Sequence, residues 1–399
     1  MLRYVIIVSD IKDKGGRGMR FLHTGDFHLD SAFGARGAVA SQLCRQRQRE
    51  LLKRVFRLAK SEECDMVLIA GDLLDTLFVS PDTQKACISV FADFEKPIII
   101  APGNHDYYTD GGFYASKDMP KNVYVFNSPE LQYFDFPTLK VTVAGYAFTS
   151  PALLRSPLCE VGRQREQSAD ILLLCAHADV NSPTSRYAPV TEGDLSRHGF
   201  DYIALGHVHN PNAEYLGGRA IYCGFPEGRA FDELGEGGVY VVDIGSDRKA
   251  SVTRHKTSRV RYVSENLTLE GVSDAEQINE LIKEKLDELG ADAYTHVRLE
   301  LEGVINLDTE IDTAQIEKSF AECLASIEIT DATLCLPDGD YLDKDVTLKG
   351  EFYRTLRPLL YSDDAAERAK ALRALKIGLA AIEGKDFTDR RAENEDNRD

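Results

Sequence analysis

Five predicted β-strands in this chain each end in a turn that carries histidine, aspartate or asparagine. The apolar runs are residues 20–24, 66–70, 97–101, 171–175 and 202–205, and the polar turns after them are residues 25–28, 71–72, 103–106, 176–177 and 206–209. In open α/β sheets, ligands bind outside the carboxyl ends of the strands. We therefore expect these side chains to meet at one edge of a sheet and to bind metal ions there, since imidazole, carboxylate and amide oxygen are all metal ligands.

Helical stretches at residues 41–60 and 80–94 separate the first strands, which indicates an α/β fold with helices covering the faces of a sheet. A second alternation has strands at 260–269, 296–304 and 326–334, with helices at 273–289 and 312–325, and a last helix is predicted at 365–382. We predict an N-terminal appendage at 1–18, a catalytic domain at 19–255, a small α/β domain at 256–338, a C-terminal helical segment at 339–383 and a disordered acidic tail at 384–399.

Composition restricts where this chain works and what it binds. No apolar run approaches the ~20 residues of a membrane span, and the first apolar residues are too few for a signal peptide. The eight cysteines form no CxxC pair, which suits a reducing compartment, so we expect a cytoplasmic protein. The net charge of −18 is concentrated after residue 255. This acidic part is a poor nucleic-acid surface, whereas the catalytic domain can offer a positive face once it binds metal.

The turns predict a site for two divalent metal ions. Two such ions about 3.5–4 Å apart can polarise a phosphoryl group and acidify a shared water. Asp72 is the natural bridging carboxylate. One ion would be completed by Asp26, His28 and His209, and the other by Asn104, His177 and His207. Mixed aspartate, asparagine and histidine ligands favour manganese, and also iron or zinc, over magnesium or calcium.

These motifs, in this order, resemble those of the calcineurin-like metallophosphoesterases over residues 19–255. The resemblance implies their sandwich of β-sheets flanked by helices. Within that superfamily, His-Leu-Asp-Ser at 28–31, Gly-Phe-Pro-Glu-Gly-Arg-Ala-Phe-Asp-Glu at 224–233 and Gly-Gly-Val at 237–239 resemble SbcD-type and YhaO-like DNA repair exonucleases.

This closer resemblance implies an activity and partners. It implies a dinuclear phosphodiesterase acting on DNA, a small capping domain at 256–338, an SMC-like coiled-coil ATPase as partner and a possible homodimer. The chain itself has no Gly-x-x-x-x-Gly-Lys-Ser/Thr loop, so ATP use would come from the partner.

The resemblance also implies catalytic roles for two residues beyond the metal ligands. His105 would protonate the leaving oxygen, and Asp75 would orient it. SbcD-type nucleases carry a histidine where this chain has Asp75, and an Asp–His pair can hold the imidazole protonated. Phe225 stands where relatives usually have serine.

Two other functions remain open on the sequence. The same site could hydrolyse a small phosphodiester or a phosphomonoester, or the chain could be a non-catalytic scaffolding subunit. The helix at 365–382 could dock a coiled coil or pack on its own domain. Arg186, Tyr187, Tyr107 and Tyr108 follow two of the motif turns and could contact substrate or simply line the rim.

Overall fold

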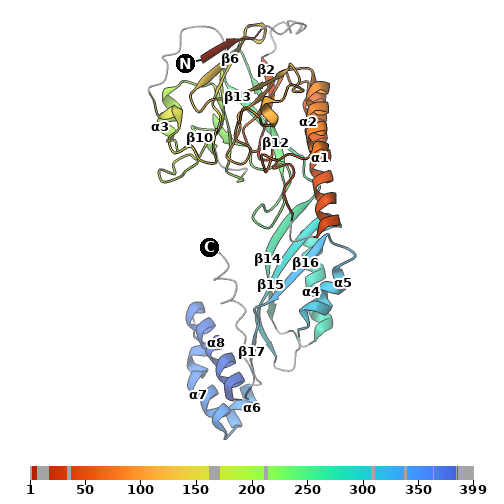
Figure 1. Cartoon of the computed structure of the whole chain (residues 1–399). Coiled ribbons are helices and arrows are strands. Elements are labelled where there is room, and N and C mark those ends of the chain that lie inside the picture. Colours follow the sequence, from red (N-terminus) through yellow and green to blue (C-terminus); the bar gives the residue numbers. More distant parts are fainter. Residues whose placement is uncertain are drawn as a thin grey trace. The chain divides into compact units, whose positions relative to one another are not determined.

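The structure, a computed structural model, describes residues 2–6, 18–33, 37–160, 171–210, 214–270, 272, 274–306, 311–336, 339–362, 364–382 and 384. It divides into two compact units, Met1–Arg261 and Tyr262–Asp399. The finer domain boundaries expected from the sequence stay predictions. Figure 1 labels the elements, and none of the helices in the described ranges is long and apolar enough to cross a bilayer.

A mixed six-stranded sheet holds the first three motif strands of the first unit. Its order is β13 (Ala250–Lys256), β12 (Gly238–Ile244), β2 (Met19–Thr24), β3 (Met66–Ile69), β4 (Ile98–Ile100) and β5 (Val123–Val125). Strands β2 to β5 run parallel, with Leu22 opposite Val67 and Val67 opposite Ile98. Strand β12 is antiparallel to both of its neighbours. The carboxyl ends of β2, β3 and β4 therefore lie at one edge.

A mixed seven-stranded sheet holds the other two motif strands. Its order is β1 (Leu2–Val5), β6 (Gln132–Phe136), β7 (Val141–Gly145), β8 (Ile171–His177), β9 (Tyr202–Gly206), β11 (Ala220–Tyr222) and β10 (Glu214–Tyr215). Strands β7, β8, β9 and β11 are parallel, so His177 and Gly206 end β8 and β9 side by side.

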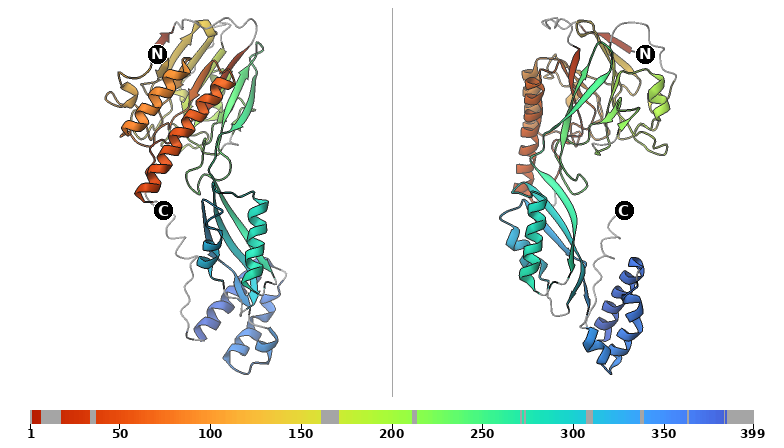
Figure 2. Two further views of the ribbon diagram at one scale, coloured as in Figure 1. Left: turned by 90° about the vertical axis from the view of Figure 1, so that its right-hand side faces the viewer. Right: turned by 180° about the vertical axis from the view of Figure 1, so that it is seen from behind.

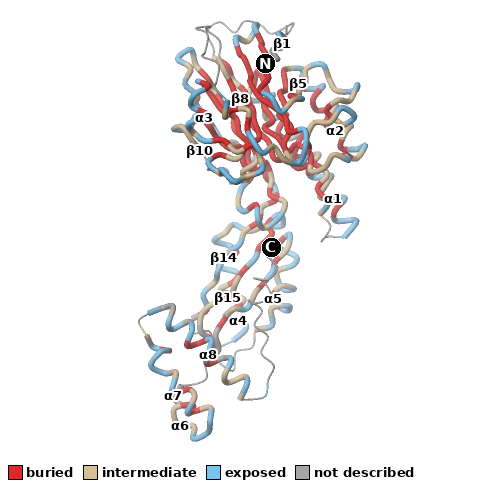
Figure 3. The backbone as a smooth tube through the Cα atoms, turned by 60° about the vertical axis from the view of Figure 1, so that its left-hand side comes forward, coloured by how far each residue is buried: buried red, intermediate tan, exposed pale blue. Residues whose placement is uncertain are grey.

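The two sheets pack face to face, as in the predicted sandwich. Leu68 of β3 and Leu173 of β8 belong to one buried cluster that draws residues from both sheets. Buried residues run through both sheets in the tube view (Figure 3). A core between two sheets holds the strands of both sheets in place. The loops that follow those strands are therefore anchored on a rigid scaffold.

Helices cover the outer face of each sheet. Helices α1 (Ala38–Ser61) and α2 (Pro81–Phe94) run side by side over the six-stranded sheet (Figures 1 and 2). Their buried residues recur every three or four positions, as an amphipathic helix requires. The Ser80 hydroxyl accepts from the Thr83 N–H and Pro81 follows it, so α2 begins with a capped first turn. Helix α3 (Glu192–Arg197) packs outside the seven-stranded sheet through Leu195.

The second unit has a small sheet of its own. Strands β14 (Arg261–Glu270), β15 (Thr295–Asn306), β16 (Ser326–Asp331) and β17 (Leu334–Leu336) form it, and β16 and β17 both pair parallel with β15. Helices α4 (Ala275–Glu288) and α5 (Thr313–Phe320) bury Ile278, Ile282 and Ile316 against it.

Three helices end the described chain: α6 (Gly339–Lys344), α7 (Leu348–Leu360) and α8 (Ala365–Ile382). They share a small core in which Leu372 and Leu375 of α8 lie with Tyr353 of α7. The face of α8 that carries Leu372 and Leu375 therefore packs against the other C-terminal helices.

The predicted fold class is confirmed: a sandwich of sheets flanked by helices, then a small α/β unit and C-terminal helices. The helix predicted at 365–382 has those bounds. Residues 2–5 of the expected appendage form β1 at the edge of the seven-stranded sheet. The expected tail lies outside the described residues apart from Gly384.

Candidate metal centre

The loops after β2 and β3 run alongside each other beyond the ends of their strands. The N–H of Asp26 donates to the carbonyl oxygen of Gly71 (3.0 Å), and that of His28 donates to the carbonyl oxygen of Asp72 (2.9 Å). Asp26, His28 and Asp72 all have positive φ, between 46° and 48°. Such a conformation costs on the order of 1–3 kcal/mol per residue and persists where the surroundings enforce it, often at functional sites.

Two glycines allow the loops to approach each other. A Cβ atom on Gly206 would lie 1.9 Å from the carbonyl oxygen of Ala70, and one on Gly103 would lie 2.2 Å from Oδ1 of Asp72. No other residue type fits either position without moving its neighbours. The glycines before the predicted ligands thus serve close packing between loops from different strands.

Three groups of acidic and histidine side chains meet at this edge. Within each group the ligand atoms lie within 4.8 Å of one another, and the groups are Asp26, His28 and His209; Asp26, Asp72 and His177; and His28, Asp72 and His105. The groups share members, so together they form one continuous cluster. Most of these side chains are buried, which is unfavourable for so many ionisable groups unless a cation or a proton balances them.

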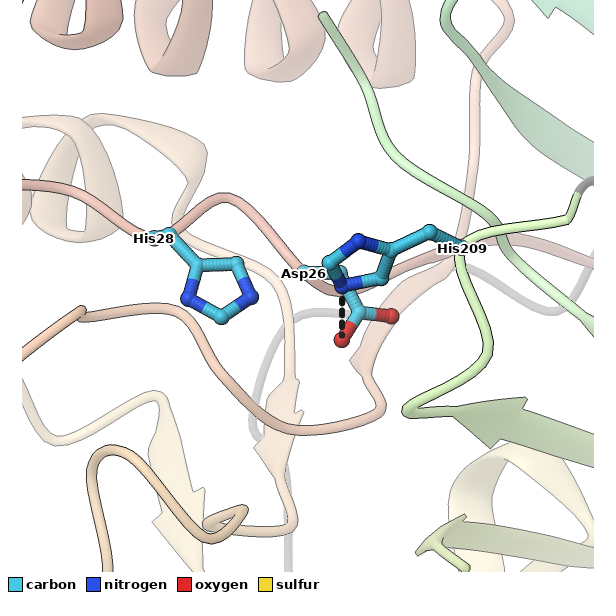
Figure 4. A group of neighbouring side chains, drawn as sticks. All are labelled: Asp26, His28 and His209. Atoms are coloured by element: carbon cyan, nitrogen blue, oxygen red, sulfur yellow. Dashed lines mark ion pairs between the residues drawn. The ribbon is translucent and has the colours of Figure 1, made fainter. Parts of the chain in front are cut away.

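The first group matches the ligand set predicted for one ion. Asp26 and His28 come from the loop after β2 and His209 from the loop after β9 (Figure 4). Nε2 of His209 lies 3.8 Å from Oδ1 of Asp26. Nε2 of His28 is buried and has no hydrogen-bond partner. Because a buried ring nitrogen without a partner is costly, this atom fits a metal ligand.

Asp72 lies between the first group and the second. Its Oδ2 is 3.7 Å from Nε2 of His28 and 3.4 Å from Nε2 of His177. Nε2 of His177 also lies 3.0 Å from Oδ1 of Asn104. One carboxylate thus faces imidazoles from both predicted ligand sets, as a bridging carboxylate must.

The ligand histidines are held through their other ring nitrogen. Nδ1 of His177 lies 2.9 Å from the carbonyl oxygen of Ala70, and Nδ1 of His209 lies 2.9 Å from Oε1 of Glu233. This arrangement, in which a carbonyl or carboxylate orients the imidazole, is typical of histidines that bind metal.

His207 lies at the side of the cluster. Its ring centroid is 5.0 Å from that of His177 and 4.7 Å from that of Tyr187. Its Nε2 faces Asp179 at 3.9 Å, and its backbone N–H donates to the Asp26 carboxylate (3.2 Å). In this structure its contact with the first ligand set is therefore made by its backbone.

His105 is the most open histidine of the cluster, with 44% of its side chain exposed. Its Nδ1 lies 3.5 Å from Oδ1 of Asp75, and the same oxygen lies 2.9 Å from Nδ1 of His28. Asp75 thus touches both the predicted proton donor and a predicted metal ligand. His105 also belongs to the third group, so its ring is within reach of the same cation site.

The charges of the cluster favour a bound cation. Burial alone would raise the pKa of Asp72, but the neighbouring His177 and His28 imidazoles lower it below its usual range. Burial opposes a charge on His177, yet the Asp72 carboxylate raises the pKa of that imidazole to about 9. The site therefore takes up positive charge, either as a proton or as a metal ion that replaces it.

Three residues that the sequence analysis did not assign also surround the ligands. Glu233 and Arg229 form a buried ion pair behind His209, and the Cys223 thiol lies 3.3 Å from Oδ2 of Asp26. Glu233 and Arg229 belong to the 224–233 segment quoted above for its resemblance. The sequence signal that could have identified this pair is an arginine and a glutamate four residues apart, next to apolar residues of that segment.

The 28–31 motif supports the loop. The Asp30 carboxylate accepts from the Ser80 N–H and the Thr83 hydroxyl (both 2.6 Å), which ties it to the start of α2. The Ser31 hydroxyl donates to the carbonyl oxygen of His28 (2.7 Å), and so does the Gln48 amide (2.7 Å). These contacts fix the backbone that carries His28.

Sequence comparison agrees with this geometry. Residues 19–211, which include β2 to β9 and the ligand loops, match the model of the calcineurin-like phosphoesterase family. Over residues 19–211 the chain is therefore similar to the calcineurin-like metallophosphoesterases, and its buried histidines and aspartates are arranged as the metal site of such an enzyme requires.

A curated relative and a solved structure are similar to this chain. The uncharacterized metallophosphoesterase YhaO of Bacillus subtilis (strain 168) is 27% identical over 241 residues, which are 57% of this chain and 57% of the relative. The chain thus spans a little over half the length of that relative. The crystal structure of TT1561 of Thermus thermophilus aligns with 59% of this chain and 99% of its own, at 13% identity and a TM-score of 0.36.

Proposed function

We propose that this chain is a dinuclear phosphodiesterase that degrades DNA from its ends, with Mn²⁺ as its metal. The observation that carries the proposal is the buried, partnerless Nε2 of His28 beside Asp72, in a cluster that contains five of the seven predicted ligands. Two divalent ions bound there would activate a water and neutralise the phosphoryl oxygens.

The residues around the ligands suit the other step of the reaction, which is protonation of the leaving oxygen. His105 is exposed enough to reach a departing oxygen, and its Nδ1 lies 3.5 Å from the Asp75 carboxylate, which can orient the ring. A positioned general acid typically contributes about 10²–10⁴-fold. Arg229 lies 3.6 Å from Asp75 and offsets part of its charge.

An exposed aromatic side chain supports a nucleic-acid substrate. Phe78 lies three residues after Asp75 and is 91% exposed. Its N–H donates to the Thr76 hydroxyl (3.2 Å), which closes a tight turn under it. Nucleobases stack on such aromatic rings, at about 1–3 kcal/mol per base. The likeness of the 28–31 and 224–233 segments to DNA repair exonucleases points the same way.

The partners follow from the same resemblance. We propose that an SMC-like ATPase controls access of DNA ends to the site, and that the chain works as a homodimer. The lack of a phosphate-binding Gly-x-x-x-x-Gly-Lys-Ser/Thr loop among the 399 residues agrees with an ATPase on a separate chain.

The test is digestion of end-labelled linear duplex DNA by the purified chain with Mn²⁺, beside His105→Ala and Asp72→Ala. Digestion by the wild type and loss in both variants is the expected result. Parallel assays with a bis-aryl and a mono-aryl phosphate report on the metal site without DNA. If the wild type cleaves the bis-aryl phosphate but no DNA, with or without an added ATPase partner, the DNA proposal is wrong and a small phosphodiester becomes the substrate.

A further inference from the structure

Arg229 connects the two carboxylates that hold the histidines of one predicted ion. Its backbone N–H donates to Oε2 of Glu233 (2.8 Å), and its Nε lies 3.0 Å from Oε1 of the same carboxylate. One of its terminal nitrogens, Nη1, lies 3.6 Å from Oδ1 of Asp75 and 3.4 Å from the Ser31 hydroxyl. The guanidinium therefore reaches both carboxylates at once.

Each of these carboxylates orients one histidine. Asp75 contacts Nδ1 of His28 at 2.9 Å, and Glu233 contacts Nδ1 of His209 at 2.9 Å. His28 and His209 come from loops that are far apart in the chain, yet they complete the same group with Asp26. No other side chain in the described ranges makes an ion pair with both Asp75 and Glu233.

Burial makes this connection energetically important. The Glu233 side chain is fully buried, and only 20% of the Arg229 side chain is exposed. A buried carboxylate that loses its partner is strongly destabilising, because an uncompensated charge is left in the interior.

We propose that Arg229 is a positioning residue that sets the spacing of His28 and His209 for the ion they share with Asp26. The inference rests on the proposed metal site and not on DNA as the substrate. Arginine suits the role because its planar fork donates in two directions at fixed angles, which the single ammonium of lysine cannot reproduce. Loss of the arginine side chain leaves Asp72, Asn104, His177 and His207 in place, so the second ion keeps its predicted ligands.

The test measures Mn²⁺ binding by equilibrium dialysis in wild type, Arg229→Lys and Arg229→Met. The matched control is Arg54→Met. Arg54 is another partly buried arginine, 24% exposed, whose Nη2 contacts Glu227 of the same segment at 3.1 Å and which touches no predicted ligand. In both Arg229 variants we expect one of two sites to weaken by about 10–100-fold while the other keeps its affinity. The control keeps both affinities.

The double variant Arg229→Met/Glu233→Gln distinguishes an effect on folding from an effect on histidine position, because it removes both charges of the ion pair. Glutamine still offers an oxygen to Nδ1 of His209. We expect this variant to unfold near the wild-type temperature without metal and still to show the weakened site. Wild-type Mn²⁺ affinity at both sites in the folded Arg229 variants would overturn the proposal.

The same dialysis experiment distinguishes failure of the proposed metal site from failure of the proposed DNA substrate. A wild type that binds no Mn²⁺ contradicts both proposals. A wild type that binds two ions and digests no DNA contradicts only the substrate, and the Arg229 comparison still decides the positioning role.

Discussion

Nδ1 of His28 lies 2.9 Å from Oδ1 of Asp75, and this contact directs Nε2 of the same ring toward Asp72. The ring is only 2% exposed, and its Nε2 has no hydrogen-bond partner among the described residues. A carboxylate on one ring nitrogen and an open position on the other is the arrangement found at histidine metal ligands.

Replacement of His28 should remove one metal ion. We expect His28→Ala to weaken one Mn²⁺ site by more than about 100-fold, because the change removes a ligand and not only its support. His198→Ala is the control, since His198 is also buried but contacts the carbonyl oxygen of Leu158 (2.9 Å) outside the cluster. Equilibrium dialysis measures both. Equal affinities in the two variants would remove His28 from the ligand set.

Asp75→Asn should slow the chemical step more than it weakens substrate binding. The carboxylate contacts both His28 and His105, and a neutral amide forms no ion pair with either ring, so the His105 ring is held less firmly toward the leaving oxygen. We expect kcat on the bis-aryl phosphate to fall by about 10²-fold with a smaller change in KM. Asp243→Asn, which breaks an ion pair with Arg20 on the sheet, serves as control. A change confined to KM would contradict the orienting role.

Metal should stabilise the folded chain. The cluster binds cations only when its loops are assembled, so Mn²⁺ at about 100 times its dissociation constant should add about 2.7 kcal/mol per site to the free energy of unfolding. We expect the melting temperature to rise with Mn²⁺ and to return after chelation. The rise should be smaller in Asp72→Asn, because Asp72 faces ligands of both ions. An equal rise in that variant would place the stabilising metal elsewhere.

Gly206→Ala should destabilise the catalytic unit. The new methyl group would lie 1.9 Å from the Ala70 carbonyl oxygen, so β9 must move away from the β3 loop. We expect a loss of about 2 kcal/mol or more in chemical unfolding. In Gly193→Ala the added atom meets nothing closer than 3.6 Å, and the position is helical, so the free energy of unfolding should stay level or increase. Unchanged stability in Gly206→Ala would mean that the two loops separate easily.

Phe78→Ala should weaken the use of DNA and leave small substrates unaffected. We expect KM for DNA to rise by about 5–100-fold, the equivalent of one lost stacking contact, with unchanged kcat/KM for the bis-aryl phosphate. Val5→Ala is the control, because Val5 is an exposed apolar residue paired with Asp135, at the opposite end of its sheet from the ligand loops. Parallel losses on both substrates would assign Phe78 a structural role.

Much of the site follows from local sequence. An apolar run followed by glycine and a polar residue marks the end of a buried strand, and parallel strands align those ends. The proximity of Asp26 and Asp72, which follow neighbouring parallel strands of one sheet, could therefore be predicted without coordinates. His177 ends a strand of the other sheet, so its approach to them depends on how the sheets pack. The helix from 365 to 382 was predictable for a similar reason, since its apolar spacing is local. Strands β6 and β7 were not predicted, although they pair with each other as a local antiparallel hairpin across residues 137–140.

The sequence by itself determined the kinds of ligand, their order and their place at the carboxyl ends of buried strands, because strand periodicity and turn composition are properties of neighbouring residues. Only the tertiary structure decided which carboxylate contacts Nδ1 of His28 and of His209, that His207 faces Asp179, and that Arg229 joins Glu233 to Asp75. Those contacts form between side chains of distant loops. Their geometry depends on how two sheets pack, and no local pattern in the chain specifies that.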